Sequence, residues 1–146
     1  MPRRDALVAG GAILHGSCLC GAVEYEVDGD LGPIVYCHCS MCRKAQGTAF
    51  ATNAPVEAAR FRITQGDETL RAYASSSGKW RYFCSICGSP IFSKRHDHPG
   101  VIRLRIGTLD SRIAAKPTAH IHVASKAEWF EILDGLPQHP VFEPSR

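Results

Sequence analysis

The sequence of 146 residues lacks long hydrophobic runs, internal repeats and blocks of like charge. A membrane-spanning helix needs roughly 20 apolar residues in a row, and no stretch comes close, so we expect no membrane partner. Low-complexity segments are also missing, and apolar residues outnumber charged ones, 45% against 21%, which is typical of a globular chain rather than a disordered one. The length fits a single domain that buries its own core.

Helical periodicity over ten or more residues is absent too, which argues against a parallel α/β sheet with long crossover helices. Short alternating or β-branched segments recur instead, separated by turn clusters rich in glycine and proline. The predicted strands are 22–27, 34–37, 48–52, 60–64, 69–74, 79–84, 89–95, 101–107 and 119–125. Segment 126–132 fits either a strand or a short helix. The pattern predicts a mainly β fold of short antiparallel strands.

Two segments show the alternation clearly. Val23, Tyr25 and Val27 share one face of segment 22–27, which predicts a half-buried strand. In segment 101–107 the apolar residues alternate with Arg103 and Arg105, so both arginines are predicted on the polar face. The one short helix that we expect covers 41–46, with a cap from Ser40 and a stop at Gly47.

No cysteine follows Cys87, although the first 87 residues hold seven. A disulfide framework favours an even number of cysteines spread along the chain, whereas tight clusters favour metal ligands. The N-terminal stretch before Cys18 is a weak candidate for a signal peptide, because Asp5, glycines and His15 interrupt its apolar run. We therefore expect a cytoplasmic protein, in a reducing compartment that keeps thiols available for metal.

The formal charge of +3 disappears once metal is counted. A zinc with four thiolates carries about −2 and one with three carries about −1, so the total comes to about zero. The apparent basicity therefore gives no support for a nucleic-acid partner.

Four cysteines form two close pairs, Cys18-x-Cys20 and Cys84-x-x-Cys87, and each pair is followed by glycine. A tight turn brings the sulfurs of Cys84 and Cys87 together, and the spacing of two places Cys18 and Cys20 on one side of an extended segment. The glycine after Cys87 leaves backbone N–H groups free to bind thiolates. Four thiolates are the usual tetrahedral ligand set of a closed structural zinc. The alternatives are buried cysteines without metal, or a redox-active CxxC pair.

Three cysteines remain, Cys37, Cys39 and Cys42. Three thiolates without a fourth describe a zinc with an open position, as a catalytic metal requires. Because sulfur ligands make such a zinc a poor source of hydroxide but a good host for another thiolate, we predict that it accepts a substrate thiol. We expect this second zinc to be the more easily lost of two per chain.

Other interpretations of the trio stay open. A histidine, among His38, His120 and His122, would close the site as a fourth ligand, although His38 alternates away from its neighbours. The trio would also fit a thiol redox site, or have no function. Other catalytic signatures are missing, because the sequence contains no glycine-rich phosphate loop, Ser-His-Asp set or HExxH motif.

Taken together, these motifs resemble the glutathione-dependent formaldehyde-activating family, also called the centromere-protein-V/formaldehyde-activating family. The resemblance covers roughly residues 14–137 and includes all seven family cysteines in order. It runs through "GSCLCGAVEYEV", "CHCSMCRKAQGTAFA", "FRITQGDETLRAYASSS", "YFCSICGSPIF" and "HIHVASKAEWFEILDGLP".

The resemblance implies a β-tent fold, in which two antiparallel sheets of short strands lean together around a structural zinc, with few short helices. It implies a structural zinc on Cys18, Cys20, Cys84 and Cys87, and a catalytic zinc on Cys37, Cys39 and Cys42. We expect a flexible N-terminal extension over residues 1–13 and one zinc-binding domain of this type over 14–146. The chain is expected to be a monomer or a homodimer.

The activity implied is that of a carbon–sulfur lyase that joins glutathione and formaldehyde as S-hydroxymethylglutathione. In our mechanistic hypothesis, a zinc-bound substrate thiolate attacks the carbonyl, and His38, Ser40 or a water protonates the alkoxide. Arg43 and Lys44 would pair with glutathione's carboxylates, or else form a solvated helix face. The competing hypotheses are another thiol–aldehyde pair, a non-enzymatic zinc module and a thiol redox protein.

Overall fold

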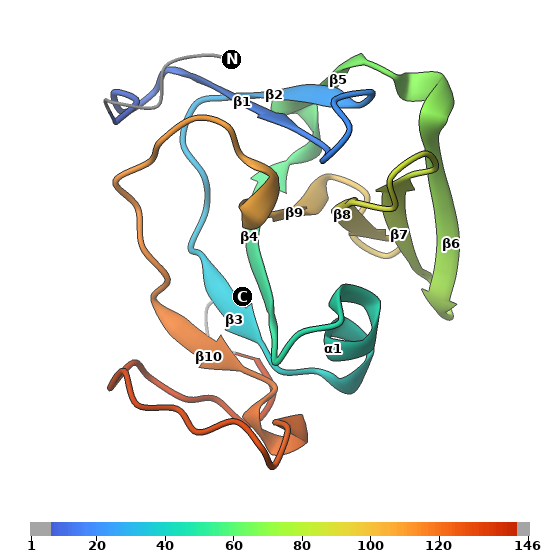
Figure 1. The fold of residues 1–146 in the computed structure, drawn as a ribbon. Helices are drawn as coiled ribbons and strands as arrows, with labels where there is room; N and C mark the ends of the chain where they lie inside the picture. The colour runs from blue at the N-terminus through green and yellow to red at the C-terminus, as the bar shows by residue number, and fades with distance from the viewer. Residues whose placement is uncertain (1–6, 143–146) are drawn as a thin grey trace.

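Two β-sheets form the framework of the described chain, residues 7–142 of the computed structural model (Figure 1). The smaller sheet has three antiparallel strands in the order β1 (Ile13–Ser17), β2 (Glu24–Asp28) and β5 (Phe61–Gln65). The larger sheet has seven strands. Their order is β10 (Ala119–Ile121), β3 (Val35–Cys37), β4 (Ala51–Glu57), β9 (Val101–Arg105), β8 (Pro90–Arg95), β7 (Lys79–Cys84) and β6 (Leu70–Ser76).

These sheets confirm the predicted mainly β class, with one difference in strand direction. All neighbouring strands run antiparallel except β10 and β3, which pair in parallel. After β9 the chain makes a long connection to the far edge of the large sheet, where β10 adds next to β3. β9 and β10 run in the same direction, so the chain must cross back along the sheet between them, and residues 106–118 make this connection without an α-helix.

The helical elements are short. The α-helix α1 covers Ser40–Gln46, and four 3₁₀ turns cover Ala58–Arg60, Asp67–Thr69, Ile106–Thr108 and Val123–Ser125. Gly47 ends α1 in the left-handed conformation with φ 66°, as predicted, because glycine pays no Cβ penalty there. The predicted Ser40 cap is wrong: Cys39 is the N-cap residue, and no side chain caps the helix.

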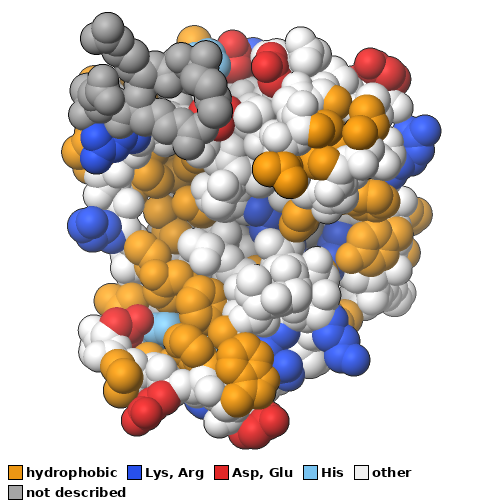
Figure 2. Space-filling view, viewed as in Figure 1, with side chains coloured by type: hydrophobic (Ala, Val, Ile, Leu, Met, Phe, Trp, Pro, Cys, Tyr) orange, Lys and Arg blue, Asp and Glu red, His pale blue; other side chains and the backbone are white. Residues whose placement is uncertain are grey.

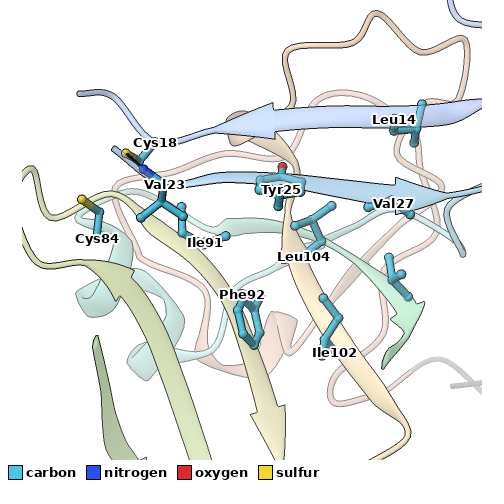
Figure 3. Packing of buried hydrophobic residues seen from close by; sticks show 11 residues of the cluster. Leu14, Cys18, Val23, Tyr25, Val27, Cys84, Ile91, Phe92, Ile102 and Leu104 are labelled. Atoms are coloured by element: carbon cyan, nitrogen blue, oxygen red, sulfur yellow. Dashed lines mark hydrogen bonds between the residues drawn. The ribbon is translucent and has the colours of Figure 1, made fainter. Parts of the chain in front are cut away.

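The main core lies between the two sheets (Figure 3). Val23, Tyr25 and Val27 are all buried, as their alternation predicted, and they face Phe92 and Leu104 of the large sheet. Each such apolar side chain contributes about 1.5–3 kcal/mol when fully buried. This packing holds the small sheet against the middle of the large one.

Some local expectations were wrong. Segment 126–132 forms neither strand nor helix, and β1 was missed because His15 and Gly16 break up the apolar pattern of residues 13–17. Arg105 was predicted on a polar face, yet only 3% of it is exposed. Its side chain points to the opposite face of the sheet from Leu104, as the alternation predicted. That face is covered at Arg105, so it is not a polar surface exposed to solvent.

The predicted flexible extension, residues 1–13, lies partly outside the described residues, since the structure describes nothing before Leu7. Of the rest, Val8 donates a backbone hydrogen bond to the carbonyl of Arg112 at 2.6 Å, and Ile13 begins β1. The boundary at residue 14 stays a prediction. Within residues 7–142 we find no helix of the length and apolar character that crossing a bilayer would take.

Candidate metal centre and active site

The four cysteines predicted to bind one zinc come together at the edge where the two sheets meet. Cys18 and Cys20 follow β1, whereas Cys84 ends β7 and Cys87 lies in the next turn. All four sulfurs lie within 4.8 Å of one another, with Cys18–Cys20 at 3.6 Å and Cys20–Cys84 at 3.8 Å. Zn–S bonds of about 2.3 Å in a tetrahedron place sulfurs about 3.8 Å apart, so the cluster fits one zinc.

Backbone N–H groups support these sulfurs. Val23 donates to the Cys18 sulfur at 3.2 Å, and Ile86 donates to the Cys84 sulfur at 3.4 Å (Figure 3). Gly21 and Gly88 close the two turns with φ of 80° and 79°, where a side chain would be strained. Such contacts stabilise thiolates and orient them toward a metal. The four cysteines thus form a cluster that fits one zinc, and their role as its structural ligands stays a prediction.

The second group of cysteines is looser. Cys37 ends β3 and Cys42 lies in α1, and both are buried with their sulfurs 3.5 Å apart. Cys39, the N-cap residue of α1, is half-buried. Among residues 7–142, the four-cysteine cluster is the one group of three or more ligand atoms that all lie so close together. The structure thus brings two of the three sulfurs together, at a spacing that two ligands of one zinc would have.

One face of the large sheet carries the polar residues near these thiols. Because residues paired across neighbouring strands point to the same face, the register aligns them. Cys37 pairs with Ala51, two residues from Asn53, and Asn53 pairs with Arg105. Farther along, Ser93 pairs with both Arg103 and Arg81. The helix α1 packs on the sheet so that Cys42 reaches Arg81.

Arg81 is the closest cation to this pair of thiols. Only 4% of Arg81 is exposed, and its Nη2 donates to the Cys42 sulfur at 3.6 Å. A hydrogen bond from Cys37, with the charges of Lys79 and Arg81, lowers the pKa of Cys42 to about 4. The same hydrogen bond and burial raise the pKa of Cys37. The surroundings therefore favour a thiolate at Cys42.

Arg105 is a second buried cation on the same face. Its Nη1 donates to the Asn53 side-chain oxygen at 3.0 Å and to the Arg103 carbonyl at 3.2 Å. Burial lowers the pKa of Arg105 to about 10, so the guanidinium still carries its charge at neutral pH. Within residues 7–142, neither Arg81 nor Arg105 forms an ion pair with a carboxylate.

A chain of three side chains leads from the surface to the cysteine loop. Asp134 accepts a hydrogen bond from His120 Nε2 at 2.8 Å, and His120 Nδ1 lies 2.8 Å from His38 Nε2. Both histidines are fully buried, among Tyr36 and Phe50. The hydrogen bond from His120 holds the pKa of Asp134 below its usual range.

The chain also determines the histidine tautomers. Because the ionised Asp134 can only accept, His120 carries its proton on Nε2 and offers Nδ1 as an acceptor. His38 then donates from Nε2, which leaves its buried Nδ1 without a proton or a partner. Burial lowers the pKa of His38 to about 4, so the ring is neutral at pH 7.

The predicted substrate-binding residues are spread unevenly. His38 is buried between Cys37 and Cys39, whereas Ser40 and Lys44 are exposed on α1. Arg43 is half-buried, and its Nε is enclosed without a hydrogen-bond partner. The structure thus buries His38 fully and Arg43 in part, and leaves Ser40 and Lys44 at the surface.

Sequence reasoning missed Arg81, Arg105 and Asp134 as functional residues. Strand alternation predicts which face of its own strand each of Arg81 and Arg105 points to. Whether that face is buried depends on the elements that cover it, which the alternation does not show. Asp134 lies 14 residues from His120, in a segment with no regular structure. No short-range pattern links these two residues.

A mainly β protein, with two sheets and a buried four-cysteine cluster that fits one zinc, is the class that this fold and site define. A family model described as glutathione-dependent formaldehyde-activating enzyme matches residues 13–125. The chain belongs to this family.

Two known proteins are similar to this chain. A protein of Halomonas elongata, named "Putative glutathione-dependent formaldehyde-activating enzyme", is 31% identical over 130 residues, which cover 82% of this chain and 81% of that protein. A crystal structure of a Rhodobacter sphaeroides protein matches with a TM-score of 0.57 and 29% identity. That match covers 70% of this chain and 91% of the other.

Proposed function

We propose that the chain is a zinc-dependent carbon–sulfur lyase of the S-(hydroxymethyl)glutathione synthase type, which joins glutathione and formaldehyde. Cys37, Cys39 and Cys42 would hold the catalytic zinc. A zinc on these residues would supply an open coordination position for the substrate's sulfur. The enzyme would work in the cytoplasm, where the seven free thiols stay reduced.

The observation that carries the proposal is the placement of Cys42 between Cys37 and Arg81. The 3.5 Å separation of the Cys37 and Cys42 sulfurs is close to the spacing of two ligands in a tetrahedral zinc site. Turning the half-buried Cys39 side chain inward would complete the three-sulfur set. Arg81 and Lys79 offset the negative charge of thiolates in this buried place.

The chain's own residues then divide the work. Arg81 holds Cys42 in its thiolate form, and α1 covers the site from one side. His38 has its orientation set by His120 and Asp134, and its unprotonated Nδ1 can accept a proton but not donate one, so a water is the better candidate for protonating the new alkoxide. Arg43, next to Cys42, would contact a carboxylate of the thiol substrate.

Thiols add to formaldehyde readily without an enzyme, so the decisive measurement is the rate of exchange. Exchange NMR on a mixture of glutathione and formaldehyde would follow interconversion of the free thiol and its adduct. We expect the native chain to accelerate exchange and Cys42→Ser to abolish the acceleration. Met41→Ser, at the exposed neighbouring position on α1, is the matched control. Exchange no faster than in buffer, with the metal sites filled, would refute the lyase.

Zinc content tests the ligand set separately. We expect about two zincs per chain in protein purified without chelator, falling to about one in Cys42→Ser with the fold kept. Zinc content unchanged by Cys42→Ser would contradict the proposed ligands, and loss of folding would make the trio structural.

A thiol redox function is a second candidate, favoured by the close contact of Cys37 and Cys42 without Cys39. In that case mild oxidation would join these two sulfurs reversibly, and reduced protein would not accelerate exchange.

A further inference from the structure

A cavity of about 310 Å³ opens beside the proposed active site, between α1 and the β6–β7 hairpin. Four of its ten lining residues are aromatic, namely Tyr73, Tyr82, Phe83 and Phe92. Tyr82 and Phe92 stack on each other with ring centres 4.2 Å apart. Figure 2 views this face, where atoms of Lys and Arg side chains show between hydrophobic ones. The wall therefore suits an apolar or aromatic group.

Some polar atoms of the cavity's lining residues lack hydrogen-bond partners among residues 7–142. Arg81 and Arg105 both line it and are both buried. The Nε and Nη1 atoms of Arg81 have no hydrogen-bond partner, nor does the Oε1 atom of Gln46, which lines the cavity too. A buried guanidinium with unmatched donors is costly unless an anion accepts from it, so the cavity is prepared for an anion.

The charges around the thiols leave room for that anion. Arg81, Arg105 and Lys79 supply three positive charges, whereas a zinc with three thiolates would carry only about −1. No carboxylate of residues 7–142 pairs with either arginine, as described above. A ligand carboxylate would supply the missing negative charge in a bidentate geometry that guanidinium favours.

Formaldehyde does not explain this cavity. It is only slightly larger than water, whose share of liquid volume is about 30 Å³. A cavity of about 310 Å³ lies at the small end of the range for ligand sites. Its aromatic wall also fits poorly with the polar peptide backbone of glutathione.

We propose that the cavity binds a 2-oxo acid with an apolar or aromatic side group, as a carbonyl substrate of this site. The guanidinium of Arg81 donates hydrogen bonds to the carboxylate of the oxo acid. The aromatic wall packs against its side group. This inference rests on the proposed function for its thiol substrate. The substrate thiol loses its proton, the thiolate adds to the ketone carbon, a C–S bond forms as the C=O π bond opens, and the alkoxide takes up one proton in place of the one that the thiol released. No oxidant or reductant is needed.

Binding of phenylglyoxylate, measured by calorimetry without thiol, tests the inference on the whole chain. We expect the native protein to bind phenylglyoxylate about 10- to 100-fold more tightly than its methyl ester, which lacks the carboxylate charge. Glyoxylate, which lacks the aromatic group, should bind more weakly than phenylglyoxylate as well. Equal affinity for the acid and its ester would overturn the inference. Both comparisons use unaltered protein, so they do not depend on a variant's folding.

Variants locate the carboxylate. Arg81→Gln should weaken phenylglyoxylate binding about 10- to 100-fold, whereas Arg71→Gln, exposed on β6, should leave it unchanged. No difference between these two variants, with both folded by circular dichroism, would refute the role of Arg81.

Competition with glutathione distinguishes the two sources of a carboxylate. If glutathione displaces phenylglyoxylate and also loses affinity in Arg81→Gln, the cavity belongs to the thiol substrate and our assignment is wrong. The proposed function can fail separately: exchange with formaldehyde but no binding of the oxo acid refutes only this inference. Binding through Arg81 without any thiol exchange refutes only the lyase.

Discussion

At the residue scale, the site depends on buried polar groups that face one another. Arg81 lies on Cys42, and Asp134 reaches His38 through His120. Burying a charge or an imidazole without a hydrogen-bond partner costs folding free energy, so each such buried group indicates that a partner lies beside it. In the hydrogen bond between His120 and Asp134, the carboxylate of Asp134 is exposed to solvent, so its charge can be changed by pH or by mutation.

Asp134→Asn should lower the thermal midpoint of unfolding at pH 7 by a few degrees, because His120 then donates to a neutral amide oxygen instead of the negatively charged carboxylate of Asp134. The folded-state pKa of Asp134 lies below its usual value, so this stabilisation is present above the unfolded carboxyl pKa of about 3.9. It is lost as pH falls through the lower folded-state pKa. Melting curves of both proteins from pH 7 to pH 2.5 should therefore converge.

Glu131→Gln, in the same loop, is the control and should melt like the native chain at every pH. A gap between Asp134→Asn and the native protein that stays constant down to pH 2.5 would contradict the role given to the carboxylate charge.

At the element scale, the pairing of β1 with β2 depends on a glycine. Gly16 lies opposite Tyr25, and a Cβ at residue 16 would come within 2.1 Å of the Tyr25 ring. Tyr25 is buried, and its hydroxyl donates to Thr108 at 2.7 Å, because Thr108 in turn donates to the Arg105 carbonyl. The ring therefore has no free direction in which to move.

Gly16→Ala should destabilise the protein by about 1–3 kcal/mol, the usual cost of forcing extra volume into a packed core. Denaturant unfolding measures this loss. Gly107→Ala is the matched control, because nothing lies within 4 Å of a Cβ there and its φ is not in the left-handed region. Equal stability of the two variants would show that Tyr25 can move at little cost.

At the scale of the whole molecule, the four-cysteine cluster ties the two sheets together. Cys18 and Cys20 belong to the small sheet's first loop, and Cys84 and Cys87 to the large sheet's β7 end. A metal there closes a loop of more than 60 residues and contributes directly to folding. Its loss should affect both sheets at once.

Cys84→Ser should prevent stable folding, whereas Ile86→Ser, at the exposed tip of the same turn, should fold normally with its zinc. Circular dichroism, together with zinc content, would measure both. A strong chelator should unfold the native chain in the same way. A Cys84→Ser protein that retains native melting behaviour would show that the sheets hold together without this metal.

Much of the fold was predictable because strand alternation is local. Val23, Tyr25 and Val27 were identified as core from six residues of sequence, and Gly47 was identified as the helix stop. The β1 strand was not, because Gly16 is there to make room for Tyr25, a contact that sequence spacing does not reveal.

The sequence by itself determined the class of fold and the four cysteines whose cluster fits one zinc. Close cysteine pairs in tight turns have few other uses, and alternation with period two follows from the strand backbone. Only the tertiary structure decided which charges are buried. Arg81, Arg105 and Asp134 come together with their partners through strand order and a long C-terminal loop, and these contacts join residues 14 to 52 positions apart. Burial is a property of the elements that cover a residue, so no local pattern contains it.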